Sequence, residues 1–116
     1  MALAHDRVAR SAVRMYTVRM SLRFEWHPAK NVANKRNHGV SFEEAQTVFY
    51  DDEAIMIDDP EHSKAEHRFI LLGMSGLLRV LLVSHCVRDE GDTIRIISAR
   101  RANRHEQRQY RERYGQ

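Results

Sequence analysis

The segment from Thr93 to Arg101 places charged side chains in an otherwise apolar stretch with the composition of a β-strand. Arg95 interrupts its apolar residues, and Arg100 and Arg101 stand at its end. A guanidinium that leaves water without an anion is strongly destabilising. Arg95 must therefore pair with a carboxylate, reach water at a sheet edge, or line a site that binds phosphate or another anion.

Two further arginines lie on strands predicted to neighbour this segment, namely Arg68 and Arg79. Neighbouring strands are only about 5 Å apart, so Arg68, Arg79 and Arg95 would converge on one phosphate if they shared a face. An arginine fork can bond two phosphoryl oxygens and stays protonated at any working pH. Whether these side chains share a face depends on strand registers that the sequence does not give.

Structural ion pairs are the alternative explanation for some of these arginines. Glu66 lies two residues from Arg68, on the same face of a strand, and Glu106 lies on the last predicted helix within reach of Arg100. Arg79 and Arg95 lack an acidic near neighbour at even spacing. For Arg68 and Arg100 both interpretations stay open.

Histidines are the candidates for proton transfer, because imidazole titrates near neutral pH. His38, His62, His67 and His85 all qualify, and we rank His38 first because it ends a predicted helix. A histidine there can equally satisfy the last helix carbonyls. His62, Glu66 and His67 also suggest a metal site, but on a strand-bound loop their spacing is a weak signal. We therefore predict no metal site.

Three other side chains have two interpretations each. Lys30 either holds a phosphate or is a solvated lysine on a polar helix face. Trp26 either stacks on a nucleic-acid base or packs in the core beside Pro28. Cys86 is the single cysteine, which excludes an internal disulfide, and its apolar neighbours favour a small buried thiol over a catalytic one.

The 116-residue chain is long enough for one small domain, and its formal net charge is +3. Residues 1–21, which we expect to be a poorly ordered N-terminal extension, hold four arginines against one aspartate, so the remaining body is neutral overall. The sequence has no apolar run near the roughly 20 residues of a membrane span and no secretory signal, so we expect a cytoplasmic protein.

Residues 22–116 are predicted to form one α+β domain with an antiparallel curved sheet. Two short helices follow a first strand, and Gly39 suits the left-handed end of the first of them. Ser41 begins the second helix, with Glu44 completing a capping box. The predicted elements are Arg23–His27, a helix ending at His38, a helix from Ser41, strands at Ala54–Asp58, His67–Leu72, Leu77–His85 and Thr93–Ser98, and a helix at Ala102–Tyr114.

The body of the chain also carries short motifs in a specific order. They are Phe24-Glu25-Trp26, Lys30-Asn31, Asn34, His38-Gly39-Val40-Ser41-Phe42-Glu43-Glu44-Ala45, Glu66 with Arg68, Gly73, Arg79, and Ile94-Arg95-Ile96-Ile97-Ser98-Ala99-Arg100. This combination resembles the BrnT family, the toxins of type II toxin–antitoxin systems. The resemblance covers nearly the whole body of the chain and is far more specific than any single motif.

The resemblance implies a fold like that of the RelE ribonuclease toxins, RNA cleavage that inhibits translation, and no cofactor. It also implies a BrnA-like antitoxin partner whose own domain makes any contact with DNA. Metal-independent cleavage must deprotonate a ribose 2′-hydroxyl, stabilise a negative phosphorane and protonate the leaving oxygen. The catalytic candidates are His38, Arg68, Arg79 and Arg95, and the RNA-binding candidates are Trp26, Lys30, Arg100 and Arg101.

A non-catalytic binding module is the alternative function. Its basic strands and last helix would hold an acidic or amphipathic segment of a partner such as an antitoxin. The two functions use similar surfaces and differ in whether RNA is turned over. Because the sequence has no helix-turn-helix pattern, we do not predict direct DNA binding.

Overall fold

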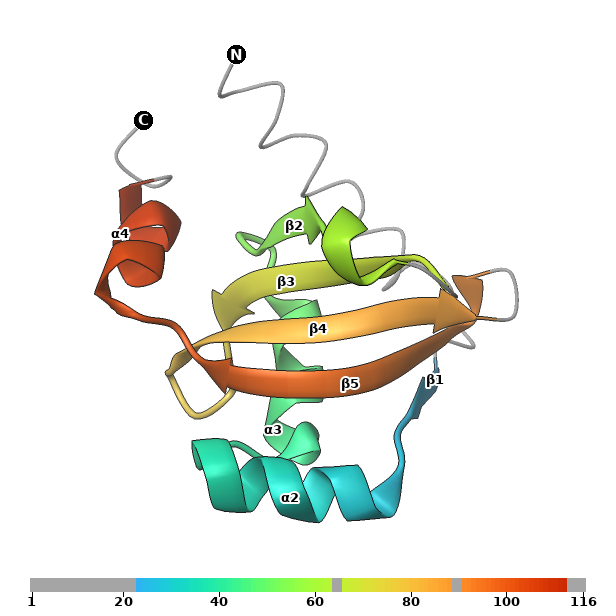
Figure 1. The fold of residues 1–116 in the computed structure, drawn as a ribbon. Helices are drawn as coiled ribbons and strands as arrows, with labels where there is room; N and C mark the ends of the chain where they lie inside the picture. The colour runs from blue at the N-terminus through green and yellow to red at the C-terminus, as the bar shows by residue number, and fades with distance from the viewer. Residues whose placement is uncertain (1–22, 64–65, 89–90, 113–116) are drawn as a thin grey trace.

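The protein is built on a five-stranded sheet. The computed structural model describes residues 23–63, 66–88 and 91–112, so the predicted N-terminal extension lies outside the described residues. The strands follow the order β1-β5-β4-β3-β2 (Figure 1) and are β1 (Arg23–Glu25), β2 (Ile55–Asp58), β3 (Arg68–Met74), β4 (Val80–Arg88) and β5 (Thr93–Arg101).

Strands β2 to β5 form the predicted antiparallel meander, whereas β1 pairs with β5 in parallel. The sequence predicted the meander but left the pairing of the first strand open. A parallel neighbour needs a long crossover connection, and here residues 26–92 lie between the two strands. Local patterns could not indicate that pairing, since β1 has only three residues.

Within the described residues, three α-helices and two 3₁₀ turns accompany the sheet, so the predicted α+β class is confirmed. They are α2 (Pro28–His38), α3 (Phe42–Thr47), η1 (Val48–Tyr50), η2 (Pro60–His62) and α4 (Arg104–Glu112). Among the described residues no helix is long and apolar enough to cross a membrane.

The helix caps follow the sequence signals in part. Gly39 ends α2 with a φ of 69°, and its N–H donates to the Lys35 carbonyl at 2.9 Å. Ser41 Oγ accepts from the Glu44 N–H at 3.0 Å, as predicted. The Glu44 carboxylate does not complete the capping box, because it binds Arg79 and the Ser75 hydroxyl instead. A long-range ion pair has thus replaced a local cap.

Gly73 lies inside β3, before the hairpin turn that joins β3 to β4. A Cβ there would come within 2.9 Å of Ala54 Cβ and Val48 Cγ1, so this position needs a glycine for close packing. The turn lies further on, where the Leu78 N–H donates to the Ser75 carbonyl at 2.9 Å. Strand β4 consequently begins at Val80, later than predicted.

The two faces of the sheet differ in what covers them. On the covered face, α2, α3 and η1 enclose a fully buried apolar core, in which Phe42, Ala45, Val48 and Phe49 pack on Leu71, Leu81, Val83, Ile94, Ile96 and Ala99. On the opposite, open face, α4 covers only one end, around Leu72, Val80, Ala102 and Tyr110. Figure 1 is viewed from the open face, with α3 behind the sheet.

Candidate functional site

Three rows of residues cross the open face from β3 through β4 to β5. The registers give the rows Arg68–Cys86–Arg95, Ile70–Ser84–Ser98 and Leu72–Leu82–Arg100. Residues directly opposite each other on neighbouring strands have Cβ atoms about 5 Å apart. Arginines therefore stand at both ends of the first row and at one end of the third, with two serines between them.

A β-bulge makes this arrangement possible. Ser98 pairs with Ser84 and Ile96 pairs with His85, which leaves Ile97 as an extra residue in β5. An extra residue reverses the alternation of faces beyond it. Arg95 and Arg100 are five positions apart, yet both therefore face the open side.

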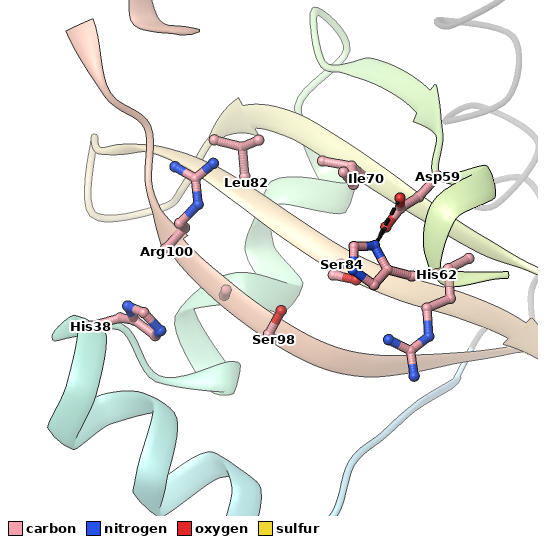
Figure 2. Close-up of a pocket in the computed structure, with 10 residues that line it drawn as sticks. His38, Asp59, His62, Ile70, Leu82, Ser84, Ser98 and Arg100 are labelled. Carbon is pink, nitrogen blue, oxygen red and sulfur yellow. Dashed lines mark hydrogen bonds and ion pairs between the residues drawn. The ribbon is translucent and has the colours of Figure 1, made fainter.

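Beside these rows the surface is hollowed. The hollow has a volume of about 240 Å³ and is lined by His38, Asp59, His62, Arg68, Ile70, Leu82, Ser84, Ser98, Ala99 and Arg100. His38 and Arg100 stand at one end, His62 and Asp59 at the other, and Ser84 and Ser98 lie between (Figure 2). The strands thus form the floor, and helix ends supply the two imidazoles.

His62 is held in place by a carboxylate. Its Nδ1 lies 3.1 Å from both oxygens of Asp59, the residue just before η2. Asp59 is itself fixed, because its N–H donates to the Arg68 carbonyl at 3.0 Å and its side chain is only 14% exposed. A carboxylate on Nδ1 favours the tautomer that leaves Nε2 free to accept a proton. His62 is 63% exposed and can meet a substrate.

Arg68 is the unusual cation of the hollow. Its backbone N–H donates to Ser63 Oγ at 2.9 Å, but its side-chain Nε is buried and has no hydrogen-bond partner among the described residues. Glu66, its expected structural partner, lies 3.5 Å from Arg88 instead. Buried N–H groups are nearly always paired, so this donor is unusual in having no acceptor among the described residues.

Arg100 has the structural partner that the sequence offered. Its two terminal nitrogens donate to the two oxygens of Glu106 at 2.9 Å each. This fork raises the pKa of Arg100 and lowers the pKa of Glu106, so both groups stay charged near neutral pH. The pair fixes the guanidinium at the rim of the hollow, opposite the His62 end.

Two predicted catalytic arginines lie outside the hollow. Arg79 binds Glu44 on the covered-face side, with Nε 3.0 Å from Oε2, and also donates to the Gly39 carbonyl at 3.0 Å. Those hydrogen bonds raise the pKa of Arg79 and lower that of Glu44. Arg95 faces the open side but is bound to Glu25 at 2.7 Å. Both arginines are thus paired with a carboxylate.

The remaining predicted residues also lie apart from the hollow. Trp26 packs edge-on against Phe42 with ring centroids 6.0 Å apart, and Lys30 is exposed on α2. Arg101 is exposed at the end of β5, where its charge helps to lower the pKa of Glu44. Burial raises the pKa of the Cys86 thiol, consistent with its interpretation as an unreactive buried residue.

Sequence reasoning did not select Asp59, Ser84 or Ser98 for the site. Asp59 lies in an acidic stretch with nothing to distinguish it from its neighbours, although a His three residues later was a usable signal. Ser84 follows the regular alternation of β4, whereas Ser98 shares a face with Arg95 only because of the bulge. In the described part of the chain, no group of three histidine, cysteine or acidic side chains is arranged to hold a metal ion.

Fold and site together define a small α+β protein with a cationic hollow that suits a phosphate-bearing substrate. Residues 26–106 match the family model of the ribonuclease toxin BrnT of type II toxin–antitoxin systems, and the chain therefore belongs to this family. A search of curated proteins finds no match.

Among solved structures, the crystal structure of the ribonuclease toxin BrnT from Brucella abortus is similar to this chain. The TM-score is 0.55 at 20% sequence identity, and the alignment covers 72% of this chain and 99% of the Brucella chain. At this identity the likeness concerns the fold, and the roles of individual residues must come from the geometry of the hollow.

Proposed function

We propose that the chain is a metal-independent endoribonuclease whose active site is the open-face hollow. The observation that carries the proposal is that the buried Nε of Arg68 has no hydrogen-bond partner among the described residues, in a hollow that two imidazoles also line. A phosphate of RNA is an anion that an arginine fork binds through two oxygens. The relation of the fold to the RelE ribonuclease toxins, which the sequence resemblance implies, forms part of this proposal.

In this mechanism His62 acts as the general base. Its Nε2 accepts the proton of a ribose 2′-hydroxyl while Asp59, 3.1 Å from Nδ1, stabilises the imidazolium that forms. The 2′-oxygen attacks the adjacent phosphorus, and Arg68 stabilises the negative phosphorane. His38, at the other end of the hollow, donates a proton to the departing 5′-oxygen. The products carry a 2′,3′-cyclic phosphate and a 5′-hydroxyl.

Such a ribonuclease would act in the cytoplasm, where it would inhibit translation by cleaving RNA. We further propose that a BrnA-like antitoxin neutralises it by covering the open face. Basic side chains there would attract an acidic segment of the antitoxin. Contact with DNA would then come only through the antitoxin.

The test is cleavage of a labelled mixed-sequence RNA in excess EDTA by the native chain and by His62→Ala. We expect native cleavage that leaves 2′,3′-cyclic phosphate ends, and a decrease of about 10²–10⁴-fold in kcat for the variant, the usual contribution of general base catalysis. His67→Ala is the matched control, because His67 also pairs with an aspartate, Asp58, but lies outside the hollow.

Three results would contradict the proposal. Loss of native cleavage in EDTA would make the reaction metal-dependent. Equal cleavage by the native chain and His62→Ala would place the chemistry elsewhere or indicate a contaminating nuclease. Absence of cleavage on free RNA would favour a ribosome-dependent enzyme or a binding module.

A further inference from the structure

A second cationic surface lies on α4, outside the hollow. Arg104, Arg108 and Arg111 are spaced four and three residues apart, so they occupy one side of the helix. With Gln107 and Glu112 they line a shallow depression of about 460 Å³. We call this surface the α4 arginine face.

The charge of this face is largely unneutralised. Within the described residues, neither Arg104 nor Arg108 forms an ion pair, and Arg111 donates only to the Gln107 amide oxygen at 3.4 Å. Glu106, the acid of the first turn, is already bound to Arg100. Glu112 is the one carboxylate on the face, against three guanidinium groups.

The helix that carries these arginines is firmly attached to the sheet. Asn103 and Glu106 form a reciprocal capping box with two hydrogen bonds of 2.8 Å. Tyr110 is 2% exposed, and its hydroxyl donates to Asp51 Oδ2 at 2.6 Å. Glu106 also joins α4 to Arg100 at the rim of the hollow. Helix α4 is therefore held at a fixed place near the C-terminal end of β5 (Figure 1).

We propose that the α4 arginine face binds the sugar–phosphate backbone of the RNA strand that flanks the scissile phosphate. Successive arginines are about one helical turn, or 5–6 Å, apart, and each can hold a phosphate without reading a base. The arginines lie on the side of α4 away from Glu106, so a strand that binds both sites passes from the hollow over this helix. The inference deepens the proposed function, because it assigns the same enzyme an extended, sequence-independent site for a single strand.

A protein partner with an acidic segment is the competing occupant. The one-turn spacing of three guanidinium groups around a single carboxylate favours RNA, whose backbone presents a regular row of phosphates. Single-stranded RNA should show a salt-dependent affinity that decreases with each lost phosphate contact. An acidic peptide should bind without any dependence on the hollow.

The experiment measures binding of a fluorescein-labelled 16-nucleotide 2′-O-methyl RNA, which cannot be cleaved, by anisotropy between 50 and 300 mM KCl. The variant is Arg104→Gln/Arg108→Gln/Arg111→Gln in the full chain. The control, Arg23→Gln/Lys35→Gln/Arg36→Gln, removes the same charge from exposed positions on β1 and α2. Cleavage of an unmodified dinucleotide, too short to reach α4, is measured in parallel.

We expect the α4 variant to lose at least about 10-fold in affinity at 100 mM KCl. The slope of log K against log salt should become shallower by about 2, because each single-strand contact contributes about 0.7. The single variant Arg108→Gln should change the slope by about 0.7, which tests the inference if the triple variant is unstable. The control should keep the native slope, and the α4 variant should cleave the dinucleotide at the native rate.

Equal slopes for the native chain and the α4 variant would overturn the inference, as would equal losses in the α4 variant and the control. Unchanged RNA binding together with lost binding of a glutamate-rich peptide would assign the face to a protein partner and also overturn it. Because the binding probe is not cleaved, a native chain that binds RNA with the expected slope but leaves the dinucleotide intact would support this inference and contradict only the proposed catalysis.

Discussion

The covered and open faces of the sheet differ in whether their buried polar groups have hydrogen-bond partners. On the covered side, the Glu44 carboxylate is only 4% exposed, and Arg79 and Ser75 satisfy it. On the open side, the Arg68 Nε is buried without a partner in the described structure. The first arrangement stabilises the fold. The second leaves a donor without an acceptor among the described residues, and under the proposed function this arginine binds the substrate while Arg79 stabilises the fold.

Removing Arg68 should give the largest effect and test the open side directly. We expect Arg68→Ala to lower kcat for RNA cleavage by about 10²–10³-fold, equivalent to about 3–4 kcal/mol, because a donor to the phosphorane is lost. The free energy of unfolding should change by less than about 1 kcal/mol, since no hydrogen bond of Nε is broken. Cleavage kinetics and urea unfolding measure the two quantities.

The matched variant Arg68→Lys keeps the charge but loses the planar fork. The kcat of Arg68→Lys should lie between those of the native chain and Arg68→Ala. Native activity in Arg68→Ala would remove this arginine from the catalytic site. A large loss of stability would show instead that its guanidinium has a structural role.

Removing Arg79 should have the converse result. Arg79→Ala leaves the Glu44 carboxylate buried and unpaired, so we expect a loss of about 3 kcal/mol in the free energy of unfolding. The kcat of the folded fraction should stay native, because Arg79 does not line the hollow. Denaturant titration and cleavage at a temperature where the variant is folded check both statements.

A double variant tests whether the loss of stability comes from the unpaired carboxylate. Glu44→Leu/Arg79→Leu should be less destabilised than Arg79→Ala, because no charge is left without a partner. If Arg79→Ala instead kept its stability and lost kcat, the contrast between the two faces would fail. Arg79 would then belong to the catalytic residues, as its sequence position first suggested.

Short-range features of this protein could be read from the sequence, whereas long-range ones could not. Gly39 and Ser41 act within one helical turn, and Glu106 lies six residues from Arg100, so caps and this ion pair were foreseeable. Glu44 and Arg79 are 35 residues apart. The local signal correctly predicted that the Glu44 N–H bonds to Ser41, but the Glu44 carboxylate binds Arg79 through a tertiary contact.

The candidate site shows the same division. His38, Arg68 and Arg100 were all nominated from the sequence, and the structure brings them to one hollow. Strict alternation along β5 would have separated Arg95 and Arg100, and only the extra residue Ile97 puts them on one face. A bulge depends on pairing with the neighbouring strand, so no local pattern indicates it.

Asn34 connects α2 to β5, and its removal should have an intermediate effect. Its buried amide donates to the carbonyls of Val40 and Ala99 at 2.8 and 2.7 Å and accepts from the Ala99 N–H at 3.1 Å. Asn34→Ala leaves these backbone groups unpaired, so we expect a loss of about 2 kcal/mol in the free energy of unfolding.

Asn34→Ala should also affect catalysis on the open side. Asn34 holds α2 on β5, and His38 at the end of α2 lines the hollow. We therefore expect kcat to fall by roughly 3- to 10-fold in the folded variant, as for a misplaced catalytic group. Urea unfolding and cleavage kinetics measure the two effects. An unchanged kcat would show that α2 is positioned independently of this amide.

The smallest predicted effect is a pH dependence of stability that arises on the covered side. His85 is fully buried against Phe49, with ring centroids 4.7 Å apart, and burial lowers its pKa to about 4. Its imidazole is therefore neutral in the folded chain at pH values where the unfolded chain is protonated. Stability is complete above the unfolded pKa of about 6.5 and is lost as pH falls toward 4.

Between pH 7.5 and 5.5 this one group should remove about 1–1.5 kcal/mol from the free energy of unfolding. His85→Gln cannot titrate, so its unfolding free energy should change less over the same interval, although it starts lower because a buried aromatic contact is lost. The exposed pairs His62–Asp59 and His67–Asp58 are present in both proteins and cancel in the comparison. Parallel pH dependences in the native chain and His85→Gln would show that the buried imidazole is accessible to protons, and the covered face would then be less closed than its packing indicates.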